Sequence, residues 1–241
     1  GDEILYASMY GDLLKNIENI TIECDPRLLS LFKRSFSKYS NKFVELGNIS
    51  NEDYKLKKID YVLYAGSLGK YYRKNLTHFI TEPFIKVDRE RYKETQNKLL
   101  KYKKKYNIGI SWKSFNNRYA SDKSLNLHDF KDVFKLPNCN VFNLQYGDVA
   151  DEINNFKNKK NELLNIEDLD LYNDFEGIAS LLKSLDIFIT VSNSTAHLAG
   201  SLGVKTLLIK PENYALFHYW NQKNNKTPWY NSVEIFEREN F

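Results

Sequence analysis

Cysteine is scarce in this chain, and long apolar runs are absent. The 241 residues include two cysteines, Cys24 and Cys139. Both fall in predicted strands without the spacing of metal ligands, so the sequence supports neither a disulfide framework nor a zinc site. No apolar stretch approaches the ~20 residues that a membrane-spanning helix requires, and no signal peptide opens the sequence. A cytoplasmic location is therefore the default expectation.

A strong excess of one charge is also missing. The formal net charge is +4, from 35 Lys and Arg against 31 Asp and Glu. Charge of this size does not imply nucleic-acid binding, and the densest basic run, Lys98 to Lys105, is expected to be an exposed helix face. No internal repeat or low-complexity tract is present. Hydrophobic residues make up 42% of the chain, which is ample for sizeable cores and predicts a folded globular protein.

The order of predicted strands and helices indicates two α/β units. Strands are expected at residues 20–24, 43–46, 61–65, 107–112, 140–145, 162–166, 187–191 and 204–209. Helices are expected between most of them, and a linking helix is expected at residues 92–106. Two successive β-α arrays predict an α/β protein with two Rossmann-like lobes, parallel sheets and a cleft between the lobes.

The expected domain limits follow from the linking helix. We expect an N-terminal lobe at residues 1–87, a linking helix at 88–106, and a C-terminal lobe with its tail at 107–241. An apolar-periodic helix begins at residue 1 with no strand ahead of it. Because a strand precedes that helix in a doubly wound fold, the N-terminal lobe is expected to be incomplete.

The most informative segment is DIFITVSNSTAHLAGSLG, residues 186–203. A short apolar strand breaks there into a helix whose first-turn amides have no partner within the helix. At the carboxyl end of a parallel strand, such a turn binds anions, commonly phosphates. The plainer alternative is a helix start without a ligand. His197 is either a phosphate or sugar contact or a packing histidine.

Polar residues follow two other predicted strands of the second lobe. Strand 107–112 leads into Lys113 and Arg118, which are suitable phosphate donors. Strand 140–145 ends in polar residues whose backbone and tyrosine ring could hold a nucleobase, while the aspartate accepts from a ribose hydroxyl. The predicted nucleoside-binding residues are Gln145, Tyr146, Gly147 and Asp148. Their convergence at one sheet edge predicts a nucleotide-type pocket.

Seven segments of the sequence resemble a known family. They are GDEILYAS, TIECDPRLLSLFKRSF, YAGSLGKYYR, GISWKS, NLQYG, TVSNSTAHLAGSLGVKTLLI and TPWY, in this order. The combination resembles the glycosyltransferase module found downstream of tetratricopeptide repeats in many bacterial proteins. That module is similar to the ADP-heptose:lipopolysaccharide heptosyltransferases and, more distantly, to O-GlcNAc transferases, all of GT-B fold. The resemblance covers nearly the whole chain.

The resemblance implies an inverting, metal-independent transfer of a sugar to a hydroxyl of a glycan or protein acceptor. The donor is a nucleotide sugar held by the C-terminal lobe, and no cofactor is expected. By the same resemblance Asp2 is the general base that deprotonates the acceptor. The residues implied in holding the donor diphosphate are Lys113, Arg118, Ser192, Asn193, Ser194, Thr195, Ala196 and His197.

Two other functions stay open at this point. Where heptosyltransferases carry an acidic residue and a glycine in the helix-start turn, this chain carries Ser192 and Ser194. One alternative is a nucleotide or sugar-nucleotide binding module without turnover. The other is a non-hydrolysing sugar-nucleotide epimerase, which shares the two-lobed architecture.

Overall fold

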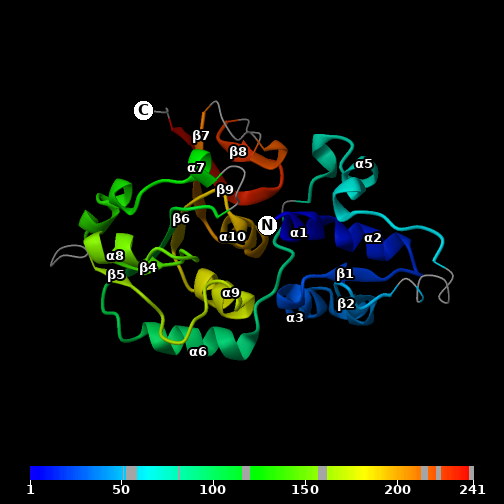
Figure 1. The fold of residues 1–241 in the computed structure, drawn as a ribbon, viewed down its shortest axis with the longest axis horizontal. Coiled ribbons are helices and arrows are strands. Elements are labelled where there is room, and N and C mark those ends of the chain that lie inside the picture. Colours follow the sequence, from blue (N-terminus) through cyan, green and yellow to red (C-terminus); the bar gives the residue numbers. More distant parts are fainter. Residues whose placement is uncertain are drawn as a thin grey trace.

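The computed structural model describes residues 1–50, 52, 59–80, 82–115, 120–156, 162–212, 217–220 and 224–238. Within them the chain forms one two-stranded and one seven-stranded sheet, with helices packed around both (Figure 1). The fold is α/β, and every neighbouring strand pair except β8 with β9 is parallel. The predicted fold class is confirmed.

The smaller sheet belongs to the N-terminal part of the chain, which we take as residues 1–80. Its elements are α1 (Asp2–Tyr6), η1 (Ala7–Met9), α2 (Tyr10–Asn16), β1 (Ile22–Cys24), α3 (Pro26–Ser35), η2 (Ser37–Lys42), β2 (Phe43–Glu45), η3 (Ala65–Leu68), α5 (Gly69–Tyr72) and η4 (Leu76–His78). Helix α3 begins as the Asp-Pro sequence predicts, because the Asp25 carboxylate accepts a hydrogen bond from the Arg27 amide at 2.9 Å.

The predicted strand at residues 61–65 is wrong. Residues 61–64 have no regular structure, and Tyr61 and Tyr64 are 92% and 87% exposed. A 3-10 helix starts at Ala65 instead. Strand-forming residues such as these adopt a strand only beside a partner strand on which their side chains pack. Within the described residues, β1 and β2 pair only with each other.

The larger sheet has the strand order β5-β4-β3-β6-β7-β9-β8 within the described residues. Its strands are β3 (Tyr106–Ser111), β4 (Cys139–Asn143), β5 (Leu163–Leu164), β6 (Ile187–Val191), β7 (Thr206–Pro211), β8 (Lys226–Thr227) and β9 (Tyr230–Arg238). Strand β9 was not predicted. It forms because the C-terminal segment returns to pair in parallel with β7 over Thr206–Pro211.

Helices flank this sheet on both faces (Figure 1). They are α6 (Arg89–Leu99), α7 (Ala120–Lys123), η5 (Leu127–Phe130), η6 (Val133–Lys135), α8 (Ala150–Phe156), α9 (Phe175–Lys183), α10 (Ser194–Leu202) and η7 (His218–Trp220). The predicted linking helix corresponds to α6, which ends well before residue 106 and packs against α9. No helix of the described ranges has both the length and the apolar character needed to cross a membrane.

Polar contacts between α3 and α9 join the N-terminal part to the larger sheet. The Ser30 hydroxyl donates to a Glu176 carboxylate oxygen at 2.7 Å, and Arg34 forms an ion pair with the same carboxylate. The Arg27 guanidinium donates to the Tyr172 carbonyl at 3.1 Å. These contacts lie on one side of the boundary between the N-terminal part and the rest of the chain. At the centre of that boundary, α1 lies beside α10 (Figure 1).

Helix α10 lies at the centre of the molecule, with α1 on one side and β9 on another. Seven of its nine residues are at most 4% exposed: Thr195, Ala196, His197, Leu198, Ala199, Ser201 and Leu202. A Cβ on Gly200 would lie 2.5 Å from Cγ of Tyr230, and one on Gly1 would lie 3.1 Å from Cδ2 of His197. The Tyr230 ring therefore packs directly on the backbone of α10 at Gly200, and Gly1 packs closely against His197.

We predict that Gly200→Ala destabilises the protein by about 1–3 kcal/mol, because the new methyl group overlaps the buried Tyr230 ring. The measurement is the midpoint of urea-induced unfolding. Gly11→Ala in α2 is the matched control, since nothing lies within 4 Å of its Cβ position and alanine favours a helix by up to ~1 kcal/mol. Equal midpoints for the two variants would contradict the close packing of α10 on β9.

Candidate functional site

The carboxyl ends of β3, β4 and β6 meet at one edge of the larger sheet, because β3 lies between the other two in a parallel arrangement. Asn193, directly after β6, links these ends. Its side-chain amide donates to Ser111 Oγ at 2.8 Å, and its side-chain oxygen accepts from the Ala196 amide at 3.0 Å. Asn193, which the family resemblance places at a diphosphate, is thus the N-cap of α10 and connects that helix to β3.

Gln145 plays a similar part at the end of β4. Its Oε1 accepts from the backbone amides of Trp112 and Lys113 at 2.7 and 2.6 Å, and its Nε2 donates to the Tyr146 carbonyl at 2.7 Å. The side chain is 2% exposed. Because its polar atoms are used inside the protein, Gln145 positions the loops, and a nucleoside contact by its side chain finds no support.

The other predicted nucleoside residues lie further out. Tyr146 is half-buried beside the rings of Phe115 and Tyr172, and its hydroxyl lies near the Ser194 side chain. Gly147 has φ +84°, and a Cβ there would lie 2.5 Å from the Phe115 ring, so glycine is required. Asp148 is exposed. The structure therefore places Tyr146, but neither Gln145 nor Asp148, against the start of α10.

The start of α10 retains two amides without a hydrogen-bond partner in the part of the chain that the structure describes, those of Ser194 and Thr195. The Ala196 amide is satisfied by Asn193. Ser192 is also engaged, because its hydroxyl accepts from Trp220 Nε1 at 2.8 Å. The positive end of the helix dipole therefore presents two donors rather than the whole predicted cradle.

His197 is a packing residue. Its ring is 3% exposed, stacks on Trp220 with centroids 4.8 Å apart, and places Nδ1 3.1 Å from the Tyr230 hydroxyl. Burial lowers the pKa of His197 well below its usual value, so the ring is neutral. Of the two roles that the sequence leaves open for His197, the structure favours packing, because the side chain lies among the rings of Tyr219, Trp220 and Tyr230.

Lys113 is balanced by a carboxylate. Its Nζ lies 2.6 Å from Glu152 Oε2, and the same carboxylate accepts from Trp112 Nε1 at 3.0 Å and from the Leu127 amide at 2.7 Å. Burial acts to raise the pKa of Glu152, but the Lys113 bond and the two other hydrogen bonds outweigh it, and the pKa is lowered. The predicted partner Arg118 lies outside the described residues.

Lys123 is a cation that the sequence reasoning missed. It ends α7, is 6% exposed, and places Nζ 4.7 Å from the centroid of the Phe217 ring. Lys123 forms no ion pair within 4 Å among the described residues. The Leu125 amide donates to the Trp112 carbonyl at 2.8 Å, which ties this segment to the end of β3. Nothing in the sequence distinguishes Lys123 from the other lysines.

Asp2 lies across from these groups, in the first turn of α1. Its side chain is exposed. Burial lowers the pKa of Lys123, while the negative charge of Asp2 acts in the opposite direction. Burial lowers the pKa of His197 in α10, and the charge of Lys123 acts in the same direction. The charges of Asp2 and Lys123 therefore act on one another, and that of Lys123 also acts on α10. Among the described residues no three His, Cys, Asp or Glu side chains lie together in a way that could hold a metal ion.

The fold and the sequence both have known relatives, although no protein-family model matches. The fold is that of E. coli ADP-heptose lps heptosyltransferase II, with a TM-score of 0.64 over 98% of this chain and 87% of that chain. Their sequence identity is 10%, so this likeness establishes the two-lobed α/β fold alone. The glycosyl transferase family 9 structure from Veillonella parvula DSM 2008 superposes with a TM-score of 0.47 at 13% identity, over 84% of this chain and 53% of that one.

In sequence, this chain is 27% identical over 259 residues to Protein FlbA of Caulobacter vibrioides (strain ATCC 19089 / CIP 103742 / CB 15). The match covers 100% of this chain and 42% of FlbA. The chain therefore spans less than half the length of this curated relative.

We predict that His197→Phe flattens the dependence of stability on pH. The unfolded state binds a proton on this histidine near pH 6.5, whereas the buried ring does so only at much lower pH. The wild-type protein therefore has the full contribution of the neutral ring to its free energy of unfolding above pH ~6.5. As the pH falls from ~6.5 toward ~5, that free energy decreases by up to ~1.4 kcal/mol per pH unit. The measurement is the free energy of unfolding in urea between pH 7.5 and 5.

The matched control for this variant is His78→Gln, since His78 is exposed. The control is expected to keep the wild-type slope, while His197→Phe loses the contribution of one proton. A wild-type slope in His197→Phe would show that the ring is not held neutral.

Proposed function

We propose that this chain is an inverting glycosyltransferase that moves a sugar from a nucleotide-diphosphate donor to a hydroxyl acceptor. The observation that carries the proposal is the start of α10, where the Ser194 and Thr195 amides have no hydrogen-bond partner among the described residues and which lies at the carboxyl ends of β3 and β6. The buried Lys123 and the exposed Asp2, whose charges act on one another, supply the proposed cation and base. Support also comes from the family resemblance of the sequence and from the heptosyltransferase-like fold. The predicted domain limits, the tetratricopeptide association and the cytoplasmic location stay predictions.

The first step of the proposed reaction is donor binding. A buried ammonium without a carboxylate partner is unfavourable, and a diphosphate would supply the missing negative charge. The amides of Ser194 and Thr195 add two donors at the positive end of the helix. The Tyr146 hydroxyl lies near Ser194 at the same helix start, which favours a nucleoside position beside it. In this arrangement Lys123 takes the role that the sequence assigned to Lys113.

The second step is sugar transfer. The acceptor oxygen forms a bond to the anomeric carbon while the bond from that carbon to the diphosphate oxygen breaks, and the acceptor proton passes to the Asp2 carboxylate. Lys123 and the α10 amides stabilise the negative charge that develops on the departing diphosphate. Because attack and departure take place on opposite faces of the sugar, the anomeric configuration inverts.

We predict that Lys123→Met weakens nucleoside diphosphate binding by about 10- to 100-fold, because one charged hydrogen bond is worth ~1.5–3 kcal/mol. A thermal-shift screen with UDP, GDP, ADP, CMP and dTDP first selects the ligand, since binding to the folded state raises its apparent stability. Calorimetry then gives the affinity. Lys131→Met, on an exposed lysine, is the control and should bind as the wild type does. Equal affinity in all three proteins would remove Lys123 from the donor site.

We predict that Asp2→Asn lowers turnover by about 10²–10⁴-fold but retains donor binding, because the amide cannot accept the proton. The assay measures release of nucleoside diphosphate from a panel of nucleotide sugars, with methyl glycosides or water as acceptor. Glu18→Gln, which changes an exposed carboxylate in the same way, is the control. Full turnover in Asp2→Asn would exclude this base. A wild-type protein that binds the nucleotide without any release would instead favour the binding-module alternative.

A further inference from the structure

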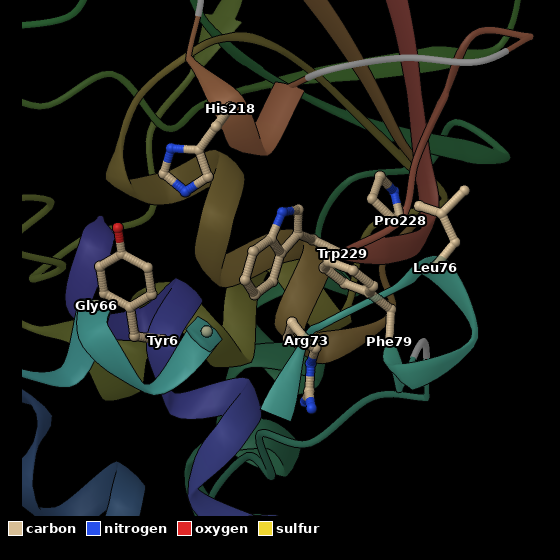
Figure 2. Close-up of a pocket in the computed structure, with 9 residues that line it drawn as sticks. Tyr6, Gly66, Arg73, Leu76, Phe79, His218, Pro228 and Trp229 are labelled. Atoms are coloured by element: carbon tan, nitrogen blue, oxygen red, sulfur yellow. The ribbon is translucent and has the colours of Figure 1, made fainter. Parts of the chain in front are cut away.

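A cavity of about 400 Å³ lies between α1 and the C-terminal segment of the chain. Tyr6, Gly66, Arg73 and Phe79 from the N-terminal part line it together with His218 and Trp229 (Figure 2). Its volume is within the range of small-molecule sites. The open amides of α10 and Lys123 do not line it, so it is separate from the proposed donor site.

Flat aromatic faces form much of the wall. The rings of Tyr6 and His218 are nearly parallel, with an interplanar angle of 10° and centroids 6.4 Å apart. The Trp229 indole is held edge-on to Phe79 with centroids 4.8 Å apart. The Gly66 backbone lies close against the Tyr6 ring, since a Cβ at that position would be 3.2 Å from Cε2. The rings are therefore fixed in place before any ligand arrives.

The polar groups of these rings are available to bond to a ligand. The Tyr6 hydroxyl, the His218 imidazole and the Trp229 indole N–H have no hydrogen-bond partner within the described ranges. Figure 2 shows the Tyr6 hydroxyl directed toward the His218 ring. Aromatic faces edged by hydrogen-bond donors and acceptors match a pyranose ring, which offers C–H groups on its faces and hydroxyls on its rim.

The positive charge of Arg73 in the cavity wall is already balanced by a carboxylate. The Arg73 side chain is 3% exposed and pairs with Asp12 at 2.8 Å. It also donates to the Ser8 carbonyl and the Tyr72 carbonyl, each at 2.8 Å. A guanidinium engaged in this way offers little attraction to a further phosphate or carboxylate. The cavity therefore favours an uncharged ligand.

The cavity also lies close to the proposed base. Asp2 and Tyr6 are four residues apart in α1, so their side chains lie on the same face of the helix, with Cβ atoms ~5–6 Å apart. A ligand packed on the Tyr6 ring would thus have its rim within one helical turn of the Asp2 carboxylate.

We propose that this cavity binds an uncharged saccharide, whose ring packs on Tyr6 and Trp229 and whose hydroxyl is presented to Asp2. That the saccharide is the acceptor rests on the proposed function, whereas its binding in the cavity does not. Tyr6 and Trp229 then select for a sugar ring, and Arg73 holds the wall through its bonds to Asp12 and Ser8.

The test is saturation-transfer difference NMR with the methyl α- and β-glycosides of glucose, galactose, mannose and N-acetylglucosamine at 10 mM. We expect at least one glycoside to bind the wild-type protein through its ring protons. Tyr6→Ala and Trp229→Phe should weaken that binding by at least about threefold, the effect of losing one aromatic contact. Tyr71→Ala, on an exposed ring that does not line the cavity, should bind as the wild type does.

Two further measurements separate this proposal from the proposed function. Tyr6→Ala should keep the wild-type affinity for the selected nucleoside diphosphate, and Lys123→Met should keep glycoside binding. If glycosides bind at the cavity and no nucleotide binds anywhere, the saccharide site stands and the glycosyltransferase proposal fails.

Three results would overturn the saccharide site. They are no binding by any glycoside of the panel, equal binding to Tyr6→Ala, or binding of glucose 6-phosphate tenfold tighter than of methyl glucoside. Displacement of the glycoside by N-acetyltyrosine amide at an equal concentration would point to a peptide side chain instead.

Discussion

The candidate site depends on two buried amide side chains, Asn193 and Gln145. Asn193 joins the end of β6 to β3, because it donates to Ser111 and also caps α10. Gln145 joins the end of β4 to β3, because its side-chain oxygen accepts hydrogen bonds from the Trp112 and Lys113 amides. Buried amides must find hydrogen-bond partners, since leaving one unpaired costs ~1–3 kcal/mol. Their bonds therefore fix three strand ends relative to one another, and the two remaining amides of α10 keep a defined direction.

Aromatic packing provides the second layer of support. His197 stacks on Trp220, and the Trp220 indole donates a hydrogen bond to Ser192. On another side of α10, the Tyr230 ring packs directly against the Gly200 backbone. This arrangement places rings from the C-terminal segment beneath the helix start. It also explains how the candidate donor site and the aromatic cavity can lie side by side, because η7 contributes His218 to the cavity and Trp220 to the packing of α10.

Several elements could be predicted from local patterns, and others could not. The Asp25-Pro26 helix start and the strand-to-helix turn at Asn193 were predicted correctly, because caps and apolar runs act within a few residues. The strand expected at residues 61–65 does not form, because no strand of the described residues pairs with this segment. For His197, the sequence left open two roles, and burial among three aromatic rings decides for packing.

The sequence by itself determined the α/β class, the location of the strand-to-helix turn at Asn193, and the family resemblance, since all three reside in short contiguous segments. Only the tertiary structure decided which lysine is paired. Lys113 and Lys123 follow the same strand, yet Glu152 neutralises the first, whereas the second is buried over the Phe217 ring with no carboxylate partner among the described residues. Charge balance depends on partners from distant segments, and those partners meet only when the chain has folded.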